Sequence, residues 1–203
     1  SALMTTASSR DHRRRLLLDS KAFGVSTVWG VGAGHVEPER AADPGLVYDL
    51  TATDYRNYLC SANYSDNTLR VITGGAVTCP SMPGKESDLN YPAISIVLDA
   101  AGRVNSWETA TRTATHVSEG AANYTVTISH PKGAVVRVEP RRLAFGKKGD
   151  KQSYTVKVVA RKRNPAAGDL VTRSGSLTWS DAKHYVTSPI LVVWQSLAPT
   201  AAH

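Results

Sequence analysis

The stretch YTVTISHPKGAVVRVEPRRLAF, residues 124–145, indicates the fold class most directly. Apolar and polar residues alternate in its first part, at 124–128, and again in its second part, at 136–138. A period of two places successive side chains on opposite faces of a β-strand, so that one face is buried and the other lies in water. The polar sequence HPKG between the two parts suits a turn. We therefore predict two half-buried strands in this stretch.

The same alternation recurs in short segments from Leu89 onward, separated by polar loops such as KKGDK. Roughly seven strands in about 105 residues are typical of an antiparallel sandwich of the immunoglobulin or fibronectin type III kind. This part of the chain has no cysteine pair to join two sheets, which favours the fibronectin type III kind. We predict a mainly β fold with this sandwich over residues 88–195 and a weakly structured tail over residues 196–203. The side chains expected to face the core are Ile94, Ile96, Tyr124, Val126, Ile128, Val136, Val138, Tyr154, Val156, Val158, Leu177, Trp179, Ile190, Val192 and Trp194.

Residues 1–85 have a different composition, which predicts an irregular and partly helical region. Ala2, Leu3 and Met4 are good helix formers, and the threonines and serines that follow them are poor ones. We expect residues 1–9 to be the end of a helix whose start lies upstream.

Two short helices and one turn are expected further along this region. The sequence DPG at 43–45 is a strong turn signal. Thr53 can cap a helix over residues 53–60, and a second helix over residues 67–73 is ended by Gly74. The side chains expected to face inward are Tyr55, Tyr58 and Leu59 in the first helix, and Leu69 and Ile72 in the second.

The composition is that of a soluble globular protein. The 203 residues are 41% hydrophobic and 20% charged, which argues against wholesale disorder. No run of about 18 apolar residues occurs, so no membrane-spanning helix is expected. No secretory signal is visible in the first residues.

The chain is basic, with a formal net charge of +7, and three of its arginines form the run Arg13 to Arg15 beside His12. Such a run can bind nucleic acid or acidic lipid. No aromatic residue is interleaved with it to stack on bases. We therefore predict no nucleic-acid partner and interpret the run as a solvated loop.

One stretch has the appearance of a catalytic or cofactor site. Glycines at 30–34 superficially resemble a dinucleotide-binding loop, but no long helix follows them to meet the phosphates. His35 could be a base, yet no nucleophile turn such as Gly-x-Ser-x-Gly occurs. The six histidines are dispersed, and two cysteines are too few for a four-cysteine zinc site. We expect the glycines to serve close backbone packing and His35 to be hydrogen-bonded into a packed loop.

Four residues are candidates for covalent modification. Cys60 and Cys79 are either free core thiols or the partners of one disulfide. Asn63 and Asn123 begin the glycosylation sequons NYS and NYT.

Taken together, the longer motifs resemble the C-terminal part of plant subtilisin-like serine proteases, the subtilases. SALMTTA at 1–7 is similar to the end of the helix that begins with the catalytic serine in that family. GAGHVEPERAADPGLVYDL at 32–50 is similar to the segment that follows, and DLNYPAISI at 88–96 is similar to the start of the family's fibronectin type III-like domain. The resemblance continues in order through RTATHV, YTVTISHPKGAVVRVEPRRLAF, SYTVKV and GSLTWSDAKHYVTSPILV.

The resemblance implies an organisation in two parts. Residues 1–85 would be the C-terminal remnant of an α/β subtilisin-like catalytic domain, and residues 88–195 the fibronectin type III-like domain. It also implies that Cys60 and Cys79 are the family's cysteine pair and that the protein is secreted to the apoplast or cell wall. The sequons at Asn63 and Asn123 would then be open to glycosylation.

The family's catalytic motifs do not occur in the chain. Asp-[Ser/Thr]-Gly, His-Gly-Thr and Gly-Thr-Ser-Met carry the triad in subtilases, and none is found in these residues. Ser1 and His35 lack those contexts, so neither is expected to be a triad member. We therefore expect no catalytic residue, cofactor or metal site, and no hydrolysis of peptides by this chain alone.

The leading hypothesis is a truncated subtilase whose partner is a catalytic domain, in cis in the family or possibly in trans. Two alternatives stay open. The chain could be a non-catalytic module that binds a protease, a peptide or a cell-wall component, or one segment of a longer, active, secreted serine endopeptidase. Under the leading hypothesis, residues 1–50 are half of an interface and expose apolar side chains in this chain. Those side chains are expected to be Leu3, Leu16, Leu17 and Leu46.

Overall fold

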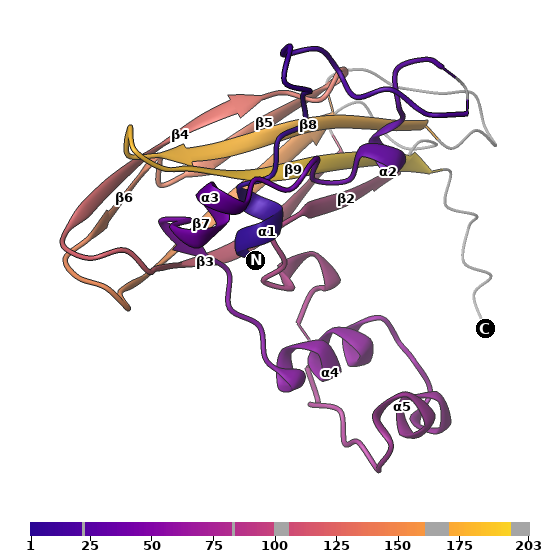
Figure 1. Ribbon diagram of the computed structural model, residues 1–203. Coiled ribbons are helices and arrows are strands. Elements are labelled where there is room, and N and C mark those ends of the chain that lie inside the picture. The colour runs from indigo at the N-terminus through magenta and orange to yellow at the C-terminus, as the bar shows by residue number, and fades with distance from the viewer. Residues whose placement is uncertain (22, 83, 100–105, 161–170, 196–203) are drawn as a thin grey trace.

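Two β-sheets pack face to face, a lobe of two helices projects from one side of the sandwich, and the N-terminal segment lies across one sheet (Figure 1). The computed structural model describes residues 1–21, 23–82, 84–99, 106–160 and 171–195, so the predicted tail over residues 196–203 lies outside the described residues. The helices are α1 (Ala2–Thr5), α2 (Val28–Val31), α3 (Pro38–Ala42), α4 (Ala52–Ser61) and α5 (Asp66–Thr73), with a 3₁₀ turn η1 (Glu86–Asp88). The strands are β1 (Leu46–Val47), β2 (Ile94–Asp99), β3 (Trp107–His116), β4 (Ala122–Ser129), β5 (Ala134–Glu139), β6 (Arg142–Phe145), β7 (Lys151–Ala160), β8 (Val171–Ser180) and β9 (Tyr185–Gln195).

The predicted mainly β sandwich is confirmed. One sheet has the strand order β1-β3-β7-β5, and the other has the order β2-β9-β8-β4-β6. Neighbouring strands run antiparallel in every described pair except β2 and β9, which pair in parallel from Ile94 opposite Ile190. These two strands lie at opposite ends of the sandwich sequence, so no tight turn forces them to be antiparallel.

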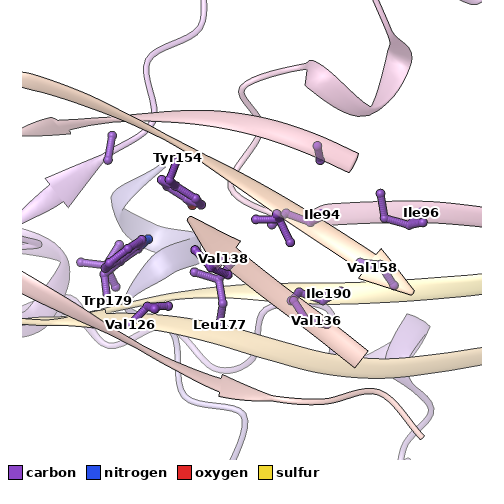
Figure 2. Close-up of a cluster of buried hydrophobic side chains, with 14 of the residues drawn as sticks. Ile94, Ile96, Val126, Val136, Val138, Tyr154, Val158, Leu177, Trp179 and Ile190 are labelled. Carbon is purple, nitrogen blue, oxygen red and sulfur yellow. The ribbon is translucent and has the colours of Figure 1, made fainter. Parts of the chain in front are cut away.

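The predicted core positions are correct. All fifteen side chains named from the alternation are buried except Ile128, which is half-buried against the same cluster. Figure 2 shows residues of both sheets meeting in this cluster, with Tyr154 beside Trp179. Their ring centroids are 5.1 Å apart and the rings meet edge to face, a favoured aromatic geometry.

The alternation did not indicate two of the strands, β3 and β6. The inward positions of β3 include Ala110, Arg112 and Ala114, all buried, so a charged residue stands where the pattern calls for an apolar one. β6 has only four residues, with Leu143 and Phe145 inward. Small or polar core residues and very short strands give no hydrophobic period to detect.

The N-terminal segment also contributes to the sandwich core. Leu46 in β1 is 0% exposed and pairs with His116 of β3, and Tyr48 is buried in the same cluster. Leu17 is also buried, so the prediction that Leu17 and Leu46 are exposed was wrong. β1 pairs with β3 at the edge of the sheet, so Leu46 is buried by the sandwich itself and needs no second domain to cover it. The same prediction is correct for Leu3 and Leu16, which are 60% and 50% exposed.

The lobe of α4 and α5 has well-formed helix ends. Thr51, rather than the predicted Thr53, caps α4, and its side chain and that of Asp54 form a reciprocal capping box. Ser65 caps α5 and Gly74 ends it in the left-handed conformation, as predicted for the glycine. Of the predicted inward residues, Leu69 is buried and Tyr58 and Leu59 are half-buried, whereas the prediction was wrong for Tyr55 and Ile72, which are exposed.

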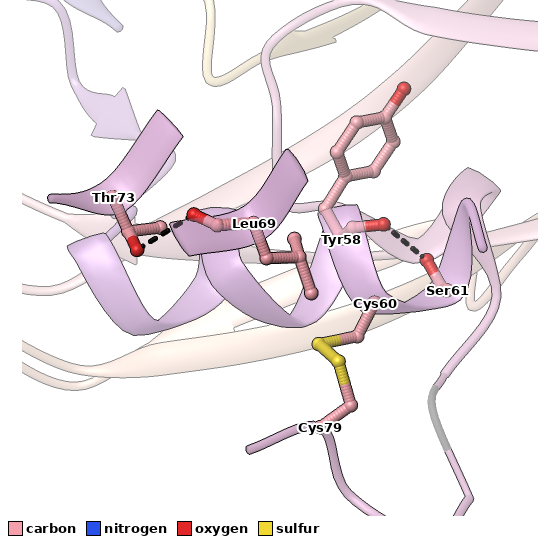
Figure 3. Close-up of a disulfide and its surroundings, with 6 residues drawn as sticks. All are labelled: Tyr58, Cys60, Ser61, Leu69, Thr73 and Cys79. Atoms are coloured by element: carbon pink, nitrogen blue, oxygen red, sulfur yellow. Dashed lines mark hydrogen bonds between the residues drawn. A yellow bond between two sulfur atoms is a disulfide. The ribbon is translucent and has the colours of Figure 1, made fainter. Parts of the chain in front are cut away.

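A disulfide closes this lobe. Cys60 at the end of α4 is bonded to Cys79, with the two Cα atoms 5.6 Å apart (Figure 3). Among the described residues there is no free cysteine. Cross-linking two residues 19 apart restricts the unfolded chain and is expected to stabilise the lobe by about 3 kcal/mol.

The burial of β1 leads to a direct prediction. Replacing Leu46 with alanine removes a fully buried side chain and should lower the free energy of unfolding by about 2–5 kcal/mol. The matched control Leu3→Ala removes an exposed leucine and should change it by less than about 0.5 kcal/mol. Urea denaturation of the two variants makes the comparison. Equal, small effects would show that β1 does not belong to the cooperative core.

Candidate docking interface

The segment from Asp43 to Leu50, here called the strap, fixes the N-terminal part of the chain to the sandwich. The turn at the start of the strap packs closely against the sandwich at Gly45, which has a φ of +76°. A Cβ at this position would overlap the Tyr124 hydroxyl and lie 2.7 Å from Cγ of His184. The predicted turn at 43–45 therefore exists, and its glycine permits both the left-handed backbone and the close approach.

An ionic cluster holds the start of the strap. The ring of His184, only 7% exposed, lies between two carboxylates. Nδ1 is 2.9 Å from Oδ2 of Asp181, and Nε2 is 3.1 Å from Oδ2 of Asp43. Asp43 also accepts hydrogen bonds from Lys183 Nζ and Ser118 Oγ, each at 2.7 Å. The cluster thus joins the strap to the β8–β9 turn and to the end of β3.

This cluster favours the charged forms of its members. The hydrogen bonds from Lys183 and Ser118 and the ion pair with His184 hold the pKa of Asp43 well below its usual range. Burial alone would lower the pKa of His184, but its hydrogen bond to Asp181 and its ion pair with Asp43 outweigh this effect and raise it. His184 is therefore an imidazolium ion over a wider pH range than a free histidine.

Hydroxyl groups inside the sandwich hold the middle of the strap. The hydroxyls of Tyr48 and Tyr154 are 2.6 Å apart in the buried core. Burial raises the pKa of both tyrosines, so they remain neutral and one donates a hydrogen bond to the other. Asp49 then accepts from Thr115 Oγ1 at 2.5 Å and pairs with Lys151 at 3.1 Å.

Arg112 fixes the segment 85–93, here called the connector, which leads into β2. Its side chain is buried and donates to the backbone oxygens of Ser87 at 2.6 Å, Tyr91 at 3.0 Å and Ala93 at 3.2 Å. Burial lowers its pKa, yet an arginine remains charged in proteins. If one of these carbonyls moved away, the buried guanidinium would lose a hydrogen bond, which is energetically costly. Arg112 therefore holds the connector in this path.

A groove lies where the N-terminal segment, the connector and the outer face of β2 and β9 meet. It has a volume of about 450 Å³, and most of its lining is apolar. Its lining includes Met4, Trp29, Tyr58, Tyr91, Val97 and Leu191. Trp29 is 64% exposed, and Leu3 and Val36 in the same segment are exposed as well. Apolar side chains exposed together in this way are typical of an interaction surface.

The glycine-rich stretch serves packing, as expected. The backbones of Ser8 and His35 exchange two hydrogen bonds of 2.8 Å, and a Cβ on Gly34 would overlap the Ser8 carbonyl. The ring of His35 is exposed, so only its main chain is held in the packed loop.

No catalytic arrangement is found among the described residues. None of the hydrogen bonds in this part of the chain joins a serine or cysteine side chain to a histidine ring. The same residues contain no group of three or more side chains able to hold a metal ion, and no helix long and apolar enough to cross a membrane. Asn63 and Asn123 are both exposed, on the α4–α5 lobe and on β4, and their glycosylation stays a prediction.

No motif or period in the sequence indicates a role for Asp181, His184 or Arg112. The spacing of Asp181 and His184 suggests a local pair, and the structure places both in the β8–β9 turn. Their partner Asp43 lies 140 residues before Lys183, so no local pattern indicates the full cluster. Arg112 was missed because a buried arginine in a strand resembles a solvent-facing one.

The His184 cluster predicts a pH-dependent stability. A raised folded pKa means that its contribution is complete below the unfolded pKa of about 6.5 and is lost as pH rises through the folded pKa. His184→Gln should therefore lower the free energy of unfolding by about 1–2 kcal/mol more at about pH 5.5 than at about pH 8.5. Denaturation at both pH values tests this, with His35→Gln as the exposed control. An equal loss at both pH values would contradict the ionic cluster.

Comparison with known proteins gives a consistent picture. The fibronectin type-III domain family model matches residues 88–192. Subtilisin-like protease SBT1.6 of Arabidopsis thaliana is 41% identical over 197 residues, which cover 95% of this chain and 25% of the relative. SBT1.5 of the same plant is 37% identical, with 96% and 25% covered, and SBT3 of Solanum lycopersicum is 37% identical, with 96% and 26% covered.

The chain spans about a quarter of the length of the curated relatives it matches. The family match covers half of the chain and coincides with the sandwich. The chain belongs to the fibronectin type-III domain family, and over almost its whole length it is similar to plant subtilisin-like proteases.

Proposed function

We propose that this part of the protein is a non-catalytic accessory module that packs against a subtilisin-like catalytic domain and stabilises it. The observation that carries the proposal is the N-terminal segment. Its strap is built into the sandwich core through Leu46 and Tyr48. In the same segment Trp29 lines the apolar groove and is exposed, and Leu3 and Val36 are exposed as well. A segment that is anchored in the sandwich core and also exposes apolar side chains is suited to bind a second domain.

The histidines support a structural role. Both ring nitrogens of His184 face carboxylates, so neither is free to take a proton from a nucleophile. Those of His116 both lie 3.2 Å from backbone carbonyls, of Gly45 and Gly120. Nδ1 of His130 accepts a hydrogen bond from the backbone of Val136. These rings hold segments in place and do not form a base beside a nucleophile.

The accessory role follows from how rigidly the docking surface is held. Arg112 fixes the connector, which lines one side of the groove, and the Tyr48–Tyr154 pair fixes the strap that follows the N-terminal lining residues. The groove is therefore formed from segments that are already held in place. A preformed apolar surface loses less conformational entropy on binding than a flexible one. The catalytic domain would bury Trp29 there together with the exposed Leu3 of the same segment, and each domain would stabilise the other.

The proposal includes a secreted location. A disulfide between Cys60 and Cys79 forms and persists in an oxidising compartment. The exposed sequons at Asn63 and Asn123 are accessible to glycosylation in the same compartment. The plant subtilisin-like proteases to which the chain is similar support this assignment.

The experiment is a chimeric protease. In Arabidopsis SBT1.6, the matching quarter is replaced by these 203 residues, and secreted peptidase activity is measured. The double variant Leu3→Asp/Trp29→Asp places two charges in the proposed interface, and we expect at least a tenfold loss of activity, about 1.4 kcal/mol or more.

The matched control is Val71→Asp on α5, which is 82% exposed and is not among the groove-lining residues, and it should leave activity unchanged. Unfolding of the isolated 203-residue chain checks that all variants fold. Full activity of the double variant would contradict docking at this surface. Labelling of the isolated chain by a serine-directed fluorophosphonate would contradict the non-catalytic role.

A further inference from the structure

The described residues 10–21 and 23–25 form a compact loop outside the sandwich, here called the basic–apolar loop. Two isolated bridges organise it, Arg10 with Leu16 and Leu18 with Val25. Oδ1 of Asp11 accepts hydrogen bonds from the backbone nitrogens of Arg13 and Arg15, each at 2.8 Å. The loop is therefore two successive ordered turns and not a random excursion.

The carboxylates of this loop accept hydrogen bonds from its backbone and stabilise its turns, whereas most of its cationic side chains are exposed to water. Oδ1 of Asp19 accepts from the backbone nitrogen of Lys21 at 2.8 Å, and Asp11 also pairs with Arg15 at 3.0 Å. Arg13, Arg14 and Lys21 are exposed and have no ion pair among the described residues. Residues 10–25 carry a formal charge of +3 out of the +7 of the whole chain.

The apolar residues of the loop point outward as well. Leu17 is buried and anchors the loop, while its neighbours Leu16 and Leu18 are exposed on the other side. Val25 lies directly opposite Leu18 in the bridge, so their side chains share one face. Phe23 is 86% exposed in the second turn, the largest exposed aromatic of this loop. Exposed aliphatic and aromatic side chains thus lie among unpaired cations.

The loop is separate from the docking groove. None of residues 10–25 lines the groove, and Figure 1 shows the loop at the end of the molecule away from α4 and α5. Docking of a partner at Trp29 in the groove therefore does not by itself account for the charge and the exposed apolar side chains of this loop.

We propose that the basic–apolar loop binds the surface of a bilayer that contains anionic lipids. Such a surface offers negative headgroups at the depth of Arg13, Arg14 and Lys21 and hydrocarbon beneath them for Leu18 and Phe23. A nucleic acid or a soluble polyanion would satisfy the cations and leave the apolar side chains in water. The contact is peripheral, because the loop is too short to cross a bilayer.

The test is co-sedimentation of the 203-residue chain with vesicles. We expect binding to phosphatidylcholine vesicles with about 30% phosphatidylserine, and at least about tenfold weaker binding to phosphatidylcholine alone. Arg13→Glu/Arg14→Glu/Lys21→Glu should weaken binding to the anionic vesicles by at least about a hundredfold, and raised salt should weaken the wild type. Leu18→Ser/Phe23→Ser should weaken it by at least about tenfold with the charge unchanged.

Two matched controls carry the same chemistry at sites outside the loop. Arg141→Glu/Arg142→Glu/Lys147→Glu reverses three other exposed cations, and Val71→Ser/Met82→Ser removes two other exposed apolar side chains. Both should bind the anionic vesicles within about twofold of the wild type. Urea denaturation of each variant confirms that it folds.

Several results would overturn the proposal. These are absent binding to the anionic vesicles, equal loss in the controls, and an unchanged affinity in the serine variant. Binding to soluble polygalacturonate as tight as to the vesicles would show that charge alone is recognised. The outcome is independent of the docking proposal, because Leu3→Asp/Trp29→Asp is expected to leave vesicle binding unchanged.

Discussion

The hydrogen bond between the buried hydroxyls of Tyr48 and Tyr154 is the contact that ties the N-terminal segment to the sandwich. A buried hydroxyl without a partner destabilises a protein by about 1–3 kcal/mol, so each tyrosine stabilises the position of the other. With Tyr48 fixed, Leu46 completes the core and β1 extends the sheet at β3. The position of the strap then places Gly45 against Tyr124 and His184, and places Asp43 within reach of its ion-pair partner His184.

This arrangement explains how segments outside the sandwich strands help to form an apolar groove on the surface of the sandwich. The strap and the connector are both held by buried polar groups, the tyrosine pair and Arg112. The segments attached to them lie across the outer face of β2 and β9 and form the groove. In contrast, the α4–α5 lobe is closed by its own disulfide and caps its own helices, so its order depends less on the sandwich.

The sequence predicted the part of the fold that follows from hydrophobic period. Fourteen of the fifteen core side chains named from alternation are fully buried, because the period of two is a local property of each strand. The alternation did not predict β3, because its inward residues Ala110, Arg112 and Ala114 are small or charged and give no hydrophobic period. Leu46 and Leu17 were placed wrongly because the burial of a short apolar run depends on a distant partner strand.

The candidate interface was less accessible to sequence reasoning than the core. The resemblance to subtilases placed residues 32–50 in a packing segment, and their glycines do serve close approach at Gly34 and Gly45. The ion pairs of Asp43 with His184 and Lys183 join residues that are far apart in the chain, and neither composition nor spacing relates them. Buried polar contacts of this kind depend on the folded geometry.

Hydrogen exchange of the intact 203-residue chain, followed by mass spectrometry, tests most directly whether the strap is part of the sandwich. If the strap belongs to the cooperative core, peptides from residues 45–50 will exchange as slowly as peptides from β3 and β7, and faster exchange will be confined to regions such as the α4–α5 lobe. Rapid exchange of residues 45–50 while β3 and β7 stay protected would contradict this, because it would show that the Tyr48–Tyr154 contact does not hold the strap in the core.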